Sequence, residues 1–260
     1  MAETLLVCFL AGMGAGIGTG FVGLSAATVI SPMLIAFLGC PWYESVGIGL
    51  ISDVLASAGA AYTYGKSGSL DLRSGGTMLS SVLVMTVAGS YLSQYLPNRE
   101  MGLLSILCTV GMGFRFLVRP VDAPSQRFLR RSARRRTALS LLCGGAIGFY
   151  CGFVGVGGGL MMLFLLTFLL GYERKTAVGT SVFVMTFTAL TGSASHFLFG
   201  HVGDYALHMV LCMAFTLLWS LLSARWANRL SPKQGGRVTG IVLLLLGAFM
   251  LTQRAGLLPG

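Results

Sequence analysis

The sequence GIGTGFVGLSAAT at residues 16–28 decides the architecture, because a related stretch, GFYCGFVGVGGGL, occurs at residues 148–160. The two stretches align at one constant offset, which pairs Gly20 with Gly152, and six of the twelve positions 12–23 are identical in 144–155. The same offset pairs further residues without a gap: Gly39 with Gly171, Val46 with Val178, Gly47 with Gly179 and Gly68 with Gly200. We infer an internal duplication in which each copy begins with a glycine-rich interruption of a hydrophobic run.

The composition predicts a membrane protein. Of the 260 residues, 55% are apolar and only 10% are charged, whereas soluble domains carry about 25% charged residues. Five long segments contain no Asp, Glu, Lys or Arg: 4–43, 74–98, 137–172, 205–224 and 238–253. Apolar runs of this length are typical of transmembrane helices. We therefore expect an all-α, polytopic membrane protein.

About eight to ten hydrophobic segments are expected. The first two, 4–22 and 25–39, would together form more than about 50 Å of helix, against a hydrocarbon core of about 30 Å. The chain must therefore break or turn back at the glycines, and the sequence leaves open whether these helices span or are re-entrant. The other expected helices are 44–65, 74–96, 101–118, 137–155, 157–170, 174–199, 203–225 and 236–254.

Charge predicts the domains and the orientation. Residues 1–118 form the first repeat and 137–260 the second, and the linker 119–136 carries seven arginines. If this linker is cytoplasmic and binds lipid headgroups, 16 of the 18 cations lie inside, and only Arg99 and Arg254 lie outside. Each half then crosses an odd number of times. This predicts an inverted repeat, as in many secondary transporters, and it explains the basic residues without nucleic acid as a partner.

Three motifs carry a resemblance to a known family: GFVGVGGGLMM at 152–162, AVGTSVFV at 177–184 and SHFLFGHVGD at 195–204. With them the chain resembles the TauE/SafE sulfite-exporter family of membrane permeases over essentially its whole length. The resemblance implies passage of a small sulfur-containing or organic anion across the bacterial inner membrane, mainly export, and no enzymatic activity. The first half departs from the pattern at Ser25–Ala27, at Ile48–Gly49 and at Asp53.

The tips of the two glycine motifs are the candidate substrate site. The start of a helix leaves backbone N–H groups unpaired with partial positive charge, and in lipid these groups need an acceptor. An anion held between two such helix starts would satisfy them, whereas the alternative is a purely structural turn. No Lys or Arg is expected near mid-membrane, so hydroxyl groups would help, unless they bond back to their own helices. The candidate residues are Gly23, Ser25, Gly155, Gly157, Gly158, Gly159, Ser52, Thr180 and Ser181.

Two ionisable residues are candidates for coupling and gating. Asp53 is the acid expected deep within a span, where such residues are usually functional. It is either a proton-coupling group or a hydrogen-bonded structural acid. His196 is expected near the outer rim, where it could gate or sense pH. The glycine ridges at 12, 16, 20 and at 144, 148, 152 are expected to pack helices closely.

Other classes of protein are less well supported. The six cysteines form no CxxC pair and no metal-ligand spacing, which disfavours a membrane-embedded redox protein; we expect no cofactor and no metal. No phosphate-binding loop is present. An anion channel of the same architecture remains an alternative. The sequence does not decide the substrate, the direction, the coupling ion or whether the chain forms a homo-oligomer.

Overall fold

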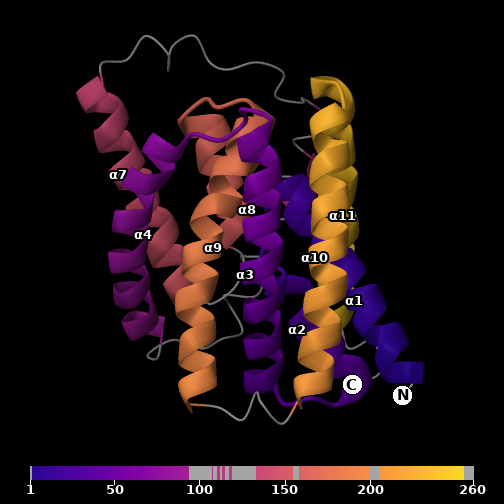
Figure 1. The fold of residues 1–260 in the computed structure, drawn as a ribbon. Helices are drawn as coiled ribbons and strands as arrows, with labels where there is room; N and C mark the ends of the chain where they lie inside the picture. Colours follow the sequence, from indigo (N-terminus) through magenta and orange to yellow (C-terminus); the bar gives the residue numbers. More distant parts are fainter. Residues whose placement is uncertain are drawn as a thin grey trace.

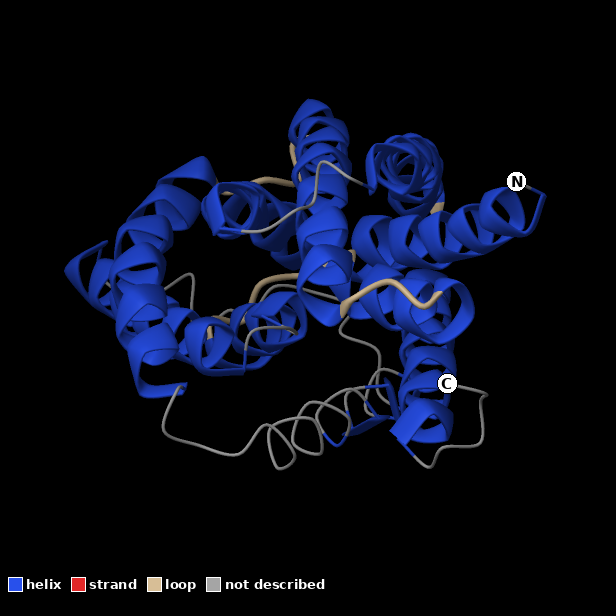
Figure 2. Cartoon of the chain, turned by 90° about the horizontal axis from the view of Figure 1, so that it is seen from below, coloured by secondary structure: helices blue, strands red, loops and turns tan. Residues whose placement is uncertain are grey.

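The protein is all-α in the part of the chain that the computed structural model describes, as the sequence predicts (Figures 1 and 2). The described residues are 2–93, 133–154, 158–199 and 205–254, with single helical positions between 107 and 118. Most of the expected linker 119–136 lies outside them, so the division into two repeats stays a prediction.

The helix bounds agree with the expected ranges to within about four residues. The first half contains α1 (Ala2–Val22), α2 (Ala27–Leu38), α3 (Trp42–Lys66) and α4 (Leu72–Ser93). The second contains α7 (Ala133–Val154), α8 (Gly158–Phe164), the π-helical turn η1 (Leu165–Leu169), α9 (Arg174–Phe199), α10 (Ala206–Arg229) and α11 (Pro232–Arg254). Among the described residues, four helical segments are long and apolar enough to cross a membrane: Ala2–Val22, Glu44–Lys66, Arg174–Ala194 and Ala206–Arg229.

Corresponding helix ends in the two halves follow the offset between the repeated stretches. Val22 ends α1 and Val154 ends α7, and likewise Trp42 begins α3 and Arg174 begins α9. Gly39 and Gly171 both have a positive φ, of 60° and 68°. The residues after them also match, because the Cys40 N–H donates to Leu34 O (3.2 Å) and the Tyr172 N–H donates to Leu166 O (2.9 Å). The repeated sequence thus folds into repeated local structure.

The first two helices form a hairpin. Cys8 and Ala11, early in α1, share an apolar cluster with Leu34 and Cys40 at the far end of α2, and Val29 packs against Gly14 nearer the break. The chain therefore returns along α2 towards the end from which α1 started. Such an antiparallel hairpin is compatible both with a re-entrant pair and with two full spans, and α1 by itself is long and apolar enough to cross a membrane.

The glycine ridges pack each first helix on a helix of the other half. Along α1, a Cβ added at Gly12 would lie 2.6 Å from Phe215 Cβ, and one at Gly16 would lie 2.6 Å from Thr216 O, both in α10. Along α7, a Cβ at Gly148 would meet the backbone of Val82 in α4. In both pairs the helices run parallel, and they lie side by side in Figure 1. Only glycine allows such close backbone contact.

The third helices of the two halves run antiparallel. The Thr186 hydroxyl donates to Ser57 Oγ (3.1 Å) midway along the pair. Towards one end Gly179 lies beside Tyr64, and towards the other Gly192 lies beside Leu50. The start of α9 therefore contacts the end of α3. An inverted repeat requires this arrangement of equivalent helices; the inverted repeat itself stays a prediction, which the packing supports.

Candidate functional site

The break in the first motif depends on one glycine. α1 ends at Val22, and Gly23 has a φ of 71°, which L side chains rarely adopt. The Gly23 N–H donates to Thr19 O (2.9 Å) and the Leu24 N–H donates to Gly18 O (3.2 Å), which closes the last turn of α1. The next helix begins at Ala27. A sharp turn thus lies between two buried helices.

The carboxyl group of Asp53 lies beside the start of α2. The side chain projects from α3, is 1% exposed, and faces the Ser25 hydroxyl and the backbone N–H of Ala26. Its Oδ1 atom has no hydrogen-bond partner among the described residues. A carboxylate is favourable at a helix start, where the N–H groups carry partial positive charge. An ionisable carboxyl group from α3 therefore lies against the first motif.

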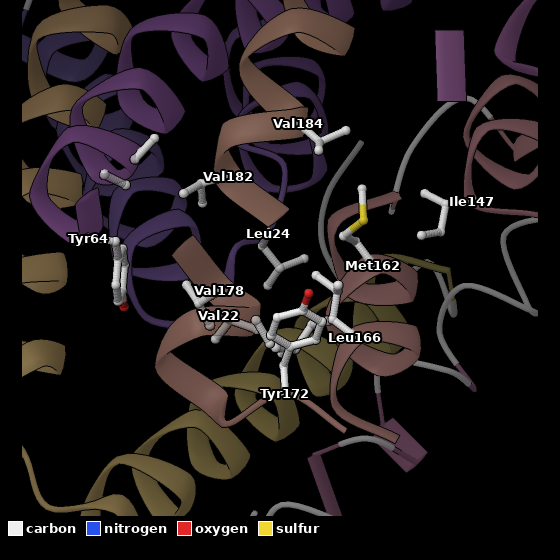
Figure 3. Close-up of a cluster of buried hydrophobic side chains, with 14 of the residues drawn as sticks. Val22, Leu24, Tyr64, Ile147, Met162, Leu166, Tyr172, Val178, Val182 and Val184 are labelled. Atoms are coloured by element: carbon white, nitrogen blue, oxygen red, sulfur yellow. The ribbon is translucent and has the colours of Figure 1, made fainter. Parts of the chain in front are cut away.

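The second motif meets the first. A Cβ added at Gly159, in α8, would collide with the carbonyl oxygen of Gly23 and would lie 2.6 Å from Met185 Sδ. Leu24 from the first hairpin and Met162 and Leu166 from the second point into one buried cluster beside α9 (Figure 3). The tips of both glycine motifs are thus in contact.

The two motifs are asymmetric in charge. At the offset that pairs Gly20 with Gly152, Asp53 corresponds to Met185. Asp53 faces the start of α2, whereas Met185 lies beside Gly159 near the start of α8. Only the first of these two helix starts therefore has a carboxylate among the described side chains around it.

The three candidate hydroxyl groups differ in their surroundings. Ser181 lies directly against Gly23, and its hydroxyl donates to Val178 O of its own helix (2.8 Å). The Ser52 hydroxyl likewise donates to Ile48 O (2.8 Å). Thr180 lies elsewhere, because its Oγ1 accepts from the Asp71 N–H in the connection between α3 and α4 (3.2 Å). Of the three, Ser181 is the one that lies against a described residue of a glycine motif, Gly23.

The structure therefore brings together Gly23, Ser25, Asp53, Gly159 and Ser181. Gly158 begins α8. Gly155 and Gly157 lie outside the described residues, as does the side chain of His196, whose backbone belongs to α9.

A buried cation was missed by the sequence analysis. Arg174 was placed in a cytoplasmic connection, but the side chain is 2% exposed and its Nη1 donates to Phe21 O at the end of α1 (3.5 Å). Beside it, the Tyr64 hydroxyl donates to Gly20 O (2.8 Å). The last carbonyls of a helix lack backbone donors, and here side chains from α9 and α3 supply them. In the sequence, Arg174 is a cation at the start of a predicted helix. The positive-inside rule explains such a cation without any contact to other helices.

Cysteines and metal ligands do not gather at the motifs. Within the described ranges, no three His, Cys, Asp or Glu residues could hold a metal ion. The Cys8 thiol lies within hydrogen-bonding range of Cys212, in the apolar cluster between α1 and α10.

Comparisons with known proteins agree with this architecture. The family model described as Sulfite exporter TauE/SafE matches residues 8–250. Two Bacillus subtilis proteins match over nearly their full length: the probable membrane transporter YunE (23% identical, 95% of this chain and 97% of the relative) and the probable membrane transporter YdhB (26% identical, 98% of each). The probable membrane transporter MJ0441 of Methanocaldococcus jannaschii is 30% identical over 43% of this chain and 44% of its own. No solved structure matches.

Proposed function

Because the chain belongs to the TauE/SafE sulfite exporter family and is a membrane transporter of that type, we propose that it exports a small sulfur-containing or organic anion by alternating access. The observation that carries this proposal is the contact between the two glycine motifs, where Gly159 meets the carbonyl of Gly23. Secondary transporters typically bind their substrates where broken helices meet. The membrane is the bacterial inner membrane in this proposal.

The anion is held on the side of the second motif. The backbone N–H groups of Gly157, Gly158 and Gly159 are its donors, with Ser181 close by. The asymmetry of charge supports this choice, because Asp53 already faces the N–H groups at the start of α2, and an ionised carboxylate there would repel an anion. Protonation of Asp53 removes this repulsion. Binding of a proton and binding of the anion are therefore linked, which makes Asp53 the coupling residue.

The basic linker lies in the cytoplasm and the connection at 200–204 lies outside. The antiparallel packing of α3 against α9 supports opposite orientations for the two halves, and the seven arginines of the linker support its cytoplasmic side. In cells that express Asn98→Cys or Gly203→Cys, a membrane-impermeant maleimide should label the protein from outside, as judged by a gel shift. Ser132→Cys should label only after the cells are opened. The unsubstituted protein, whose described cysteines are mostly buried, is the control. Labelling of Ser132→Cys in intact cells would overturn the inverted repeat.

Flux in proteoliposomes tests the proposed function. With sulfite, sulfonates, thiosulfate and carboxylates as the panel, we expect saturable uptake of at least one sulfur oxyanion. Counterflow separates a transporter from the alternative channel, because only a transporter accumulates labelled substrate against an unlabelled internal pool. Gly159→Ala should abolish this uptake, since its Cβ collides with Gly23 O, whereas Gly76→Ala should not, since nothing lies within 4 Å of that position. Uptake of every compound equal to that of empty liposomes would contradict the proposal.

A further inference from the structure

Arg174 joins the ends of two helices from different halves. Its Nη1 donates to Phe21 O at the end of α1 (3.5 Å), and its Nη2 donates to Ala227 O in the last turn of α10 (3.4 Å). The neighbouring Lys175 forms its hydrogen bond with α10, where its Nζ donates to Asn228 O (2.6 Å). Arg174 therefore links the start of α9 to the end of α1 by a polar contact, beside the apolar cluster that Phe21 and Val22 share with Ala177 and Val178.

The charge of Arg174 is surrounded by two helix ends, by the Tyr64 hydroxyl and by the neighbouring acid Glu173. The guanidinium group is buried, forms no ion pair within the described part of the chain, and leaves its Nε without a hydrogen-bond partner there. Helix C-termini carry partial negative charge, and two of them meet at this group. A planar guanidinium can donate to two acceptors in different directions, which a lysine ammonium on its flexible stem does less well.

These bonds are long. N–H···O hydrogen bonds usually measure about 2.9–3.0 Å, whereas both guanidinium bonds exceed 3.3 Å. Lys175, on the same turn of α9, forms a much shorter one. The bond from Arg174 to the end of α1 is thus geometrically weaker than the bond from Lys175 to α10, so the bond to α1 is the more easily broken of the two.

We propose that Arg174 is a positioning residue for transport: it holds the first glycine motif against α9, and the transport cycle breaks and remakes its bonds to the ends of α1 and α10. The proposal rests on the proposed function as a transporter. It acts through Gly23, which follows the end of α1 directly and lies against Ser181 of α9. A shift of the start of α9 therefore moves the point where the two motifs meet.

Two measurements on the full chain test this role. Hydrogen–deuterium exchange of the peptide covering residues 19–27 reports how firmly the motif is held, and it requires no substrate. For Arg174→Lys we expect exchange there to be faster by about tenfold, because the loss of a hydrogen bond worth about 1.4 kcal/mol corresponds to that factor. The maximal rate of uptake should fall by about tenfold while the apparent affinity changes less than about twofold.

Lys175→Met is the matched control, because it removes a neighbouring cation whose hydrogen bond goes to α10 and not to the end of α1. Both readouts should stay at the level of the unsubstituted protein. Tyr64→Phe, which removes the donor to Gly20 O without changing charge, should accelerate exchange in the same peptide, and it replaces Arg174→Lys if that variant fails to assemble. Unchanged exchange in Arg174→Lys or Tyr64→Phe, or equal acceleration in Lys175→Met, would overturn the proposal. If the unsubstituted protein transports nothing, the proposed function fails, and the exchange arm still decides whether Arg174 holds the motif.

Discussion

Replacement of Gly148 by valine is expected to abolish assembly of the folded protein. A Cβ at this position collides with the carbonyl of Val82 and lies 2.7 Å from Val82 Cα, so the obstacle is backbone rather than a movable side chain. α7 and α4 would have to separate along their whole contact. Overpacking within a core costs about 1–3 kcal/mol of folding free energy even where side chains can move aside. Here the obstacle is the backbone of α4, which cannot move aside in the same way.

Size-exclusion chromatography in mild detergent measures this effect, and Gly145→Val is the matched control. A Cβ at Gly145 lies 3.6 Å from Met85 Cγ, an ordinary contact, although the residue is on the same helix and nearly one turn away. We expect the Gly148 variant to give less than about one tenth of the monodisperse peak of the control. Equal peaks would show that the glycine ridge does not determine the packing of α7 on α4.

Replacement of Asp53 by asparagine is expected to leave the protein folded but to lower maximal flux by more than about tenfold, equivalent to about 1.4 kcal/mol of activation free energy. It should also remove the pH dependence of flux. Asparagine has nearly the same volume, and its side-chain oxygen can still accept from the Ala26 N–H, since Asn and Asp cap helix starts about equally well. It cannot exchange a proton. The variant thus loses the ability to bind and release a proton but keeps the hydrogen bond to the start of α2.

Asp53→Ala separates the two roles of this acid. Alanine leaves the Ala26 N–H without its buried acceptor, which costs about 1–3 kcal/mol, so thermal melting should show lower stability. If Asp53 only stabilises the start of α2, Asp53→Asn will transport with the rate and pH dependence of the unsubstituted protein, and only the alanine variant will be defective. That outcome would end the coupling hypothesis.

Much of the fold was predictable because its signals are local. The length of each apolar run, the breaks at Gly23 and Gly39 and the constant offset between the two copies predict the described helix ends to within about four residues. The π-helical turn at Leu165–Leu169 was not predicted. It lies inside an apolar run, and hydrophobicity does not distinguish it from an ordinary α-helical turn.

The site was only partly predictable, because its partners come from distant helices. The sequence predicts Asp53 as a candidate coupling acid but could not show that it faces Ser25 and Ala26, which depends on how α2 packs on α3. Thr180 is adjacent to Ser181 in the sequence, yet it contacts Asp71 instead of a glycine motif, since neighbours on a helix point in different directions. Arg174 was treated as a topological signal, because burial of its side chain depends on the ends of α1 and α10.

The first helix of each half packs on a helix of the other half, and this packing has a consequence for biosynthesis. The glycine ridge of α1 is covered by α10, which the ribosome completes only after most of the chain has entered the membrane. Until then the exposed ridge faces lipid or an insertion chaperone. A chain that stops after the arginine linker would lack α10 for α1 and α7 for α4, and membrane proteases that recognise loosely packed helices would remove it. The order of translation therefore delays the native fold until the last quarter of the polypeptide is inserted.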